Sequence, residues 1–389
     1  MPDAELDAAP RDPTQMLDAF LVAAVRPPLR RLGPPASRVV GLFVGLVAAT
    51  TSLAYVGAHA ADAHTPAQLA VGVLGVVVVA AWAALECAAL AAPYAPAATA
   101  DAESGAKAEP APAPGDALAP WRAGAEFAVW MLFIYACDRT DLVARGEKHT
   151  SQKSFWCLWG LICLAAACTV RSCRAPRVLA REQTEEWKGW MQLMFLLYHY
   201  FAQAQLYNAI RVYIAAYVWM TGYGNFLYYQ KTGNFGAVRV CQTLFRLNFF
   251  VVVVCVALRN EYMLYYIAPM HTLFTLFVWL ALRIARARND DARVLVVKVV
   301  STLLLTALLY DVEAVFRFAF GWQPMRALVA FHDPLHPEFT DELHEWRFRS
   351  GLDRYVWVFG MACAALFPVL SRALARVDAA EAAARRAIR

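Results

Sequence analysis

The sequence predicts an all-α protein, a polytopic transmembrane helical bundle of about ten spans. Two observations point to this fold. Hydrophobic residues make up 60% of the 389-residue chain and charged residues only 17%, whereas soluble domains are nearer one-quarter charged. Apolar runs of about 20 residues, the length of a helix that crosses a bilayer, recur along the chain. They lie at residues 39–58, 69–92, 121–137, 155–170, 187–204, 206–223, 239–258, 262–282, 293–312 and 353–371.

The distribution of Lys and Arg predicts that both termini are cytosolic. With ten spans and a cytosolic N-terminus, most basic residues outside the spans lie on the cytosolic side. The exception is the loop that holds Arg139, Arg145, Lys148 and Lys153. Residues 1–38 have no early apolar core and no cleavage site, so we expect a cytosolic tail rather than a secretory signal. The net charge of +5 therefore reports topology, and no nucleic-acid partner is expected.

A low-complexity segment at residues 93–119 is expected to divide the chain. It is rich in Ala, Pro and acidic residues, cannot bury a core, and predicts a disordered linker. It separates two N-terminal spans within 39–92, which look like plain membrane anchors, from the main bundle at 120–375. Residues 376–389 are expected to form a cytosolic helical tail. The nine cysteines are scattered, so we expect small buried residues rather than disulfides or a zinc site.

Polar side chains follow one face of three predicted spans. In hydrocarbon such groups are costly unless they pair or face a cavity, and their helical spacing places each set on one face. The sets are Glu185, Lys188, Gln192, His199 and Gln203; Arg239, Gln242 and Arg246; and Lys298, Thr302, Thr306, Glu313 and Arg317. We expect them to surround a hydrophilic interior. The alternative is that they pair with one another and hold the helices together.

The segment from Arg181 to Gln230 combines this polarity with many tyrosines. Some tyrosines are expected in the aromatic belts at the membrane interface, and others could form the wall of a site for a sugar ring or an adenine. Polar and aromatic residues in this segment and beyond it are candidates for substrate contact. They are Asp138, Glu185, Glu186, Tyr200, Asn208, Arg211, Tyr223, Asn225, Glu313 and Arg347.

The densest acid/base cluster follows the ninth span, on the predicted non-cytosolic side. It includes His332, Asp333, His344 and Glu345, and a His beside a carboxylate can deprotonate a hydroxyl. Three interpretations remain open: a catalytic or acceptor-binding rim, a solvated loop with capping residues, and a metal site. Prolines within the loop argue against the regular helix that paired His ligands need, so no metal is expected. No nucleophile block precedes the cluster, which argues against a self-contained serine hydrolase.

Several ungapped strings between about Trp121 and Pro368 carry a resemblance. They are CDRT at 137–140, EQTEEWKGWMQ at 182–192, YHY at 198–200, YNAIRVYIAAYVWMTGYGNFLYY at 207–229, LFRLNF at 244–249 and HEWRFRSGLDRYVWVFGM at 344–361. In this order they resemble the Cas1p-type ten-span acyltransferase family. That family includes fungal capsule O-acetylation proteins, plant reduced-wall-acetylation proteins and animal sialic-acid O-acetyltransferases.

The resemblance implies a membrane-bound O-acetyltransferase that moves acetyl from acetyl-CoA, as a co-substrate, to glycan or polysaccharide hydroxyls in the Golgi membrane. No tightly bound cofactor is implied. Animal members carry a luminal esterase-like domain, and we expect this chain to lack it, as the plant proteins do. The family continues through further spans, so we expect a truncated or divergent member. Membrane lipid and the glycan acceptor are the expected partners, and a separate luminal esterase-like acetyltransferase is a further candidate.

Under this hypothesis the acetyl group passes from cytosolic acetyl-CoA to a luminal acceptor. Candidate ligands for the CoA phosphates are the basic residues near the cytosolic mouth, namely Arg181, Lys188, Arg239 and Arg246. His199 would serve as general base or transient acyl carrier.

The far-side loop would activate the acceptor hydroxyl, through His332 and His344 with Asp333 and Glu345 as orienting carboxylates. Two functions without catalysis are the alternatives. One is a transmembrane carrier that supplies acetyl donor to a separate luminal transferase, and the other is a scaffold in a wall-synthesis complex.

Overall fold

The computed structural model describes residues 41–42, 44–47, 65–91, 118–140, 150–171, 181–333 and 336–388. The predicted tail at 1–38, most of the first span at 39–58 and nearly all of the linker at 93–119 lie outside these residues. The described residues form helices and no strand, which confirms the all-α fold class.

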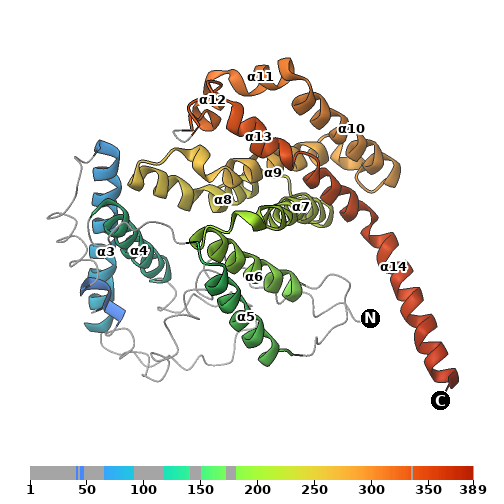
Figure 1. Ribbon diagram of the computed structural model, residues 1–389, viewed down its shortest axis with the longest axis horizontal. Coiled ribbons are helices and arrows are strands. Elements are labelled where there is room, and N and C mark those ends of the chain that lie inside the picture. Colours follow the sequence, from blue (N-terminus) through green and yellow to red (C-terminus); the bar gives the residue numbers. More distant parts are fainter. Residues whose placement is uncertain are drawn as a thin grey trace, which may run out of the picture. The chain divides into compact units, whose positions relative to one another are not determined.

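Every predicted span from the second to the tenth coincides with a helix (Figure 1). These are α3 (Pro66–Ala91), α4 (Ala119–Arg139), α5 (Gln152–Cys168), α6 (Arg181–Tyr200), α7 (Tyr207–Thr232), α8 (Ala237–Leu258), α9 (Ile267–Arg283), α10 (Ala292–Asp311) and α14 (Val356–Ile388). Short helices connect them: the 3₁₀ helices η2 (Ala204–Leu206), η3 (Tyr262–Tyr265) and η4 (Arg286–Arg288), then α11 (Glu313–Gly321), α12 (Gln323–Val329) and α13 (His344–Leu352).

Four helical segments of the described chain are long and apolar enough to cross a membrane by length and composition. They lie at 66–89, 237–258, 292–311 and 344–377. Helices α5 and α9 are apolar but shorter. The pattern is that of a multi-span membrane bundle. The last helix, α14, continues through Pro368 to Ile388, so residues 376–388 of the predicted tail extend the helix of the tenth span.

Capping residues explain where several helices begin and end. The Ser151 hydroxyl accepts a hydrogen bond from the Ser154 amide at the start of α5, and the Asp291 carboxylate accepts one from Arg293 at the start of α10. Both satisfy amides that the first helical turn leaves without partners. Helix α7 ends at Gly233, whose φ of 60° lies in the left-handed region that favours glycine.

The described chain forms two compact units, and the first comprises residues up to 145 together with 253–260. In it, α3 packs against α4 around Trp82 and Ala125. The Arg122 guanidinium donates two hydrogen bonds of 2.9 Å to the carboxylate of Glu86, which is 1% exposed. Helix α3 therefore contains a buried, paired charge and is not the plain anchor that its apolar composition predicts.

The second unit, residues 146–252 and 261–389, has its core along α7, which packs against α14 and α9. Two glycines allow this packing. A Cβ atom on Gly222 would lie 1.8 Å from the carbonyl oxygen of Trp357, and one on Gly360 would lie 2.3 Å from that of Trp219. Small residues let membrane helices approach this closely. The buried Trp357 indole then stacks on Phe274 of α9, with ring centroids 5.3 Å apart.

The prediction that one continuous polar face runs along the ninth span is wrong. Helix α10 ends at Asp311, and Val312 adopts an extended conformation before α11 begins. Glu313 and Arg317 therefore belong to a separate helix and do not continue the face of Lys298. Sequence spacing alone cannot show this break, because Val312 is an ordinary apolar residue at the end of an apolar run.

Lys298 also binds backbone groups at the end of a neighbouring helix, which the sequence pattern did not predict. Its ammonium group donates hydrogen bonds to the carbonyl oxygens of Leu282 and Ile284, at 3.3 and 2.5 Å, and to Asn289 Oδ1 at 2.5 Å. A cation at the end of α9 satisfies carbonyls that have no partner within the helix. The ammonium group of Lys298 is therefore occupied by carbonyl oxygens at the end of α9.

Candidate functional site

A cavity of about 1240 Å³ lies within the second unit. Its wall combines α6, α7, α8, α9 and η3 with α13 and Phe331. The volume exceeds the roughly 300–1,000 Å³ of pockets for drug-sized ligands. Several of its lining side chains are polar or charged. They are Lys188, Gln192, His199, Arg211, Thr221, Asn225, Arg239, Thr243, Arg246, His271, Thr275, Glu345 and Arg349.

Helix α8 contributes the cationic face of this cavity. Arg239 and Arg246 are seven residues apart, so they lie two helical turns, or about 10 Å, apart on one face. The Arg239 guanidinium stacks over the Tyr228 ring at 4.2 Å from its centroid. Thr243 lies between the two arginines on the cavity wall, in the place that the sequence pattern assigned to Gln242.

Helix α6 is tied to α7 beside the cavity through the Tyr217 hydroxyl. That hydroxyl donates a hydrogen bond to the Lys188 carbonyl oxygen at 3.1 Å and accepts one from Gln192 Nε2 at 3.0 Å. The Lys188 ammonium itself lies 2.6 Å from the Glu185 carboxylate. The polar stripe of the fifth predicted span therefore serves both proposed roles, since it faces a cavity and also links two helices.

Two of the lining arginines are paired with carboxylates. Arg211 Nη2 lies 2.6 Å from Asp353 Oδ2, and Arg349 Nε donates a 2.7 Å hydrogen bond to Glu345 Oε2. The Arg349 guanidinium also stacks over the Tyr266 ring at 4.8 Å. Within each pair the positive and negative charges cancel. The remaining positive charge of the cavity therefore comes mainly from α8.

A histidine that the sequence patterns did not single out lies in the wall formed by α7 and α9. His271 lines the cavity and is 8% exposed. Its Nδ1 is 2.5 Å from the Thr221 hydroxyl oxygen. One turn further along α7, Asn225 Nδ2 donates to the Thr221 carbonyl oxygen at 2.8 Å and approaches the Thr275 hydroxyl at 3.4 Å. Thr221 and Asn225 are four residues apart, as are His271 and Thr275. This shared helical spacing was the sequence signal that could have identified these residues.

Some residues predicted to contact substrate line the cavity, namely Arg211 and Asn225. Others lie elsewhere: Glu186, Tyr200 and Asn208 are exposed on their helices. The ring of Tyr223 stacks on Trp219, with centroids 4.6 Å apart, in the packing between α7 and α14.

Two further predicted residues cannot be assigned to the cavity wall. Asp138 belongs to the first unit and lies 3.3 Å from Arg139. The side chain of Arg181, predicted to bind CoA phosphate, lies outside the described residues, although its backbone begins α6.

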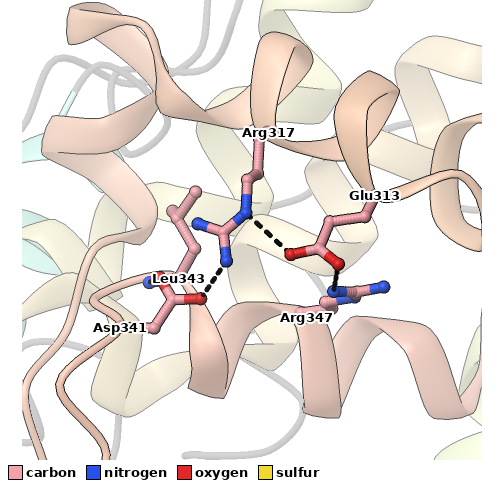
Figure 2. Close-up of polar contacts among 5 residues, drawn as sticks. All are labelled: Glu313, Arg317, Asp341, Leu343 and Arg347. Carbon is pink, nitrogen blue, oxygen red and sulfur yellow. Dashed lines mark hydrogen bonds and ion pairs between the residues drawn. The ribbon is translucent and has the colours of Figure 1, made fainter.

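The predicted acid/base loop contains an exposed chain of ion pairs (Figure 2). Arg317 donates 2.9 Å hydrogen bonds to Glu313 and to Asp341. Arg347 lies 3.6 Å from Glu313, and the Leu343 amide donates to Asp341 at 3.1 Å. Glu313 and Arg347, both predicted to contact substrate, therefore bind one another in a network that fastens the loop to α11 and α13.

This network lowers the pKa of both carboxylates. The hydrogen bond from Arg317 is the main cause for Glu313. Burial alone would raise the pKa of Asp341, but the Leu343 amide and Arg317 outweigh it, so this pKa is also below its usual value. Both groups stay charged at neutral pH, and this supports the interpretation of the loop as a solvated segment held by its own polar residues.

His332 and His336 lie at the surface of this loop, and His344 is half-buried. His332 has a 64% exposed side chain, with Nε2 4.0 Å from Glu342. The His344 ring stacks on Phe339 with centroids 4.0 Å apart. Asp333 is half-buried. Glu345, predicted to orient His344, is instead buried beside Arg349 and lines the cavity.

Residues 58–385 match the family model of the ten-transmembrane acyltransferase domain found in Cas1p. The chain belongs to this family. Over 254 residues it is 34% identical to the N-acetylneuraminate (7)9-O-acetyltransferase of Danio rerio. The aligned part covers 62% of this chain and 31% of that relative. No solved structure matches the chain.

Family membership and the apolar helices together show a multi-pass integral membrane protein of the Cas1p acyltransferase type. Within it, the cavity offers a guanidinium-rich wall on one helix and a buried histidine on another. The first can hold an anionic group through charge-assisted hydrogen bonds, and the second can accept or donate a proton.

Proposed function

We propose that this Cas1p-family protein is a membrane-bound O-acetyltransferase. It would move acetyl from acetyl-CoA to hydroxyls of a glycan in the secretory pathway, in the Golgi membrane. The observation that carries the proposal is the cavity within the membrane bundle, lined by Arg239 and Arg246 of α8 and by ionisable groups of other helices. The relative named for O-acetylation of N-acetylneuraminate makes a sialylated glycan the first acceptor to test.

The donor site follows from the charge of the cavity. CoA carries several phosphate oxygens, and guanidinium groups bind them through paired N–H donors. Arg239 and Arg246 present two such groups about 10 Å apart along α8, and Lys188, which is paired with Glu185, lines the cavity from α6. Tyr228, already stacked with Arg239, offers an aromatic surface for the adenine ring.

Acyl transfer in this cavity needs one proton acceptor near the thioester. The acceptor oxygen forms a bond to the acyl carbon, the carbon–sulfur bond breaks, and the hydroxyl proton moves to a base that returns it to the leaving thiolate. Two imidazoles line the cavity and can take this role, His199 from α6, which was predicted as base or acyl carrier, and His271 from α9. A separation of charges inside a membrane helix bundle is stabilised by fixed polar groups, such as Thr221 and Asn225.

The test is reconstitution of the full chain in sealed liposomes. Labelled acetyl-CoA is supplied outside, and either a sialylated oligosaccharide or a neutral polysaccharide fragment is enclosed. The proposal predicts acetyl ester on the enclosed glycan without any added protein. Label that enters while no ester forms would support the carrier alternative, and ester that appears only after addition of a luminal transferase would do the same.

A matched pair of variants makes this assay specific for the cavity. Arg239→Gln combined with Arg246→Gln removes its cationic face and should abolish most ester formation. Arg286→Gln changes an exposed arginine outside the cavity and should leave the rate unchanged. Equal loss in both variants would contradict a donor site on α8.

A further inference from the structure

The hydrogen bond between His271 and Thr221 fixes the orientation of the imidazole ring. Nδ1 and the Thr221 hydroxyl oxygen are 2.5 Å apart, and the hydroxyl oxygen is also 3.3 Å from the Tyr217 carbonyl oxygen of the preceding turn. The Thr221 hydroxyl has one proton to donate and lone pairs to accept with. If it donates to the Tyr217 carbonyl, it accepts from Nδ1–H of His271. All three groups are then satisfied in one chain.

This arrangement determines the state of the other ring nitrogen. A neutral imidazole that donates through Nδ1 carries its lone pair on Nε2. The structure gives Nε2 no hydrogen-bond partner among the described residues, while His271 lines the cavity. Thr221 thus sets the tautomer of the ring, and the basic Nε2 atom is available to a ligand in the cavity. The same arrangement occurs in sites where a third group orients a catalytic histidine.

Among the described residues of this unit, the other histidines lack this combination, and His344 does not line the cavity. His332 and His336 have side chains that are 64% and 56% exposed in the loop. His199 lines the same cavity but is exposed. His271 is 8% exposed, on a helix packed against the centre of the core. A proton acceptor works best where its position is fixed and water is excluded.

We propose that His271 is the general base of acyl transfer in this cavity and that Thr221 is its positioning residue. The assignment rests on the proposed O-acetyltransferase function. Nε2 takes the proton of the acceptor hydroxyl while its oxygen forms a bond to the acyl carbon. The carbon–sulfur bond breaks, its electron pair leaves on the CoA sulfur, and the imidazolium returns the proton to that thiolate. No other reactant is needed.

The test uses the full chain in the liposome assay with His271→Asn, His271→Ala and His336→Asn. The Asn side chain can still donate a hydrogen bond to Thr221, so the variant keeps the local contact while removing the base. Ester formation should fall by roughly 10²- to 10⁴-fold, the usual contribution of a general base, with unchanged affinity for CoA. Added imidazole should partly restore the Ala variant. His336→Asn, at an exposed loop position, should keep the wild-type rate.

Thr221 is tested by a conservative pair. Thr221→Ser keeps the hydroxyl and should keep most of the activity. Thr221→Val keeps the shape but cannot orient the ring, and should lower turnover at least about tenfold, within the range of a general base, without weakening CoA binding. Similar loss in the Ser and Val variants would show a packing role and contradict the assignment.

Three other outcomes would overturn the proposal. The first is wild-type turnover in His271→Asn while the unmodified chain forms ester, which leaves the proposed function intact. The second is loss of CoA binding together with activity and no rescue by imidazole, which makes His271 a structural residue. The third is acetylated Thr221 detected by mass spectrometry, which makes the hydroxyl a covalent nucleophile. If the unmodified chain forms no ester, the proposed function fails and this inference fails with it.

Discussion

Arg211 of α7 and Asp353, in the turn between α13 and α14, form an ion pair with 2.6 Å between Nη2 and Oδ2. The side chains are only 15% and 5% exposed. The pair fixes the start of α14 against α7 at the cavity wall. Arg211 was predicted to contact substrate, but its charge is already matched by a buried carboxylate. Its main effect is therefore on the shape of the cavity.

Removal of one member of this pair should destabilise the protein strongly. Asp353→Leu leaves an unmatched buried guanidinium, and such a change costs about 3–5 kcal/mol. Arg211→Met should do the same, whereas the double variant should recover most of the loss, since apolar replacements of a whole buried pair are often neutral. Unfolding in mixed micelles measures this. Additive losses in the double variant would show that the two residues do not interact.

The arginines of α8 should control donor affinity. Arg239→Gln and Arg246→Gln each remove hydrogen bonds to a charged group, which contribute about 1.5–3 kcal/mol, so the dissociation constant for CoA should rise roughly 10- to 100-fold. Calorimetric titration of the purified chain with CoA measures this effect. Arg286→Gln serves as the control, and unchanged affinity in both α8 variants would exclude them as phosphate ligands.

The contact between α7 and α14 should tolerate no side chain at Gly222. Its Cβ would lie 1.8 Å from a backbone oxygen, so one helix has to move. We expect Gly222→Ala to lose at least about 1–3 kcal/mol, the usual cost of overpacking. Gly224→Ala is the matched control on the same helix, because a Cβ there meets nothing within 4 Å. A thermal shift in detergent compares the two, and equal stabilities would contradict the close approach of these helices.

The ion pairs of Figure 2 should loosen in acid. The pKa values of Glu313 and Asp341 are below their ordinary values, so their contribution is present above the ordinary carboxyl pKa of about 4 and disappears as pH falls through the lowered values. Hydrogen exchange of residues 336–347 should therefore accelerate in acid. Because the pairs are exposed, the effect is small. Glu313→Gln should remove part of this pH dependence, and an identical profile in that variant would contradict the network.

The pair of His336 and Glu338 should respond in the opposite direction. The hydrogen bond that His336 donates to the Glu338 carboxylate raises the pKa of His336, so its contribution is complete below the ordinary His pKa of about 6.5 and is lost as pH rises through the raised value. His336→Asn should abolish any change in loop exchange across this interval. A response that persists in the variant would assign it to another group.

Periodicity predicted the helices well because one apolar stripe per span is a local property. It also predicted that Lys188 and Arg246 face a common interior. Helical spacing gives the face on which each residue lies, and the cost of exposing a polar group to lipid turns that face inward. It failed where a long-range contact decides the outcome. The pairing of Arg211 with Asp353 and the approach of His271 to Thr221 join residues far apart in the chain, and single-helix spacing contains no information on them.

The central claim is that the cavity of the second unit holds the acyl donor, and cryo-electron microscopy of the full chain in lipid nanodiscs with a non-hydrolysable acetyl-CoA analogue tests it most directly. We predict density for the analogue in the cavity, with phosphate oxygens about 2.7–2.9 Å from the guanidinium groups of Arg239 and Arg246 and the acyl end directed at His271. An analogue bound elsewhere on the protein, or a cavity filled by lipid chains while the analogue is bound, would contradict it.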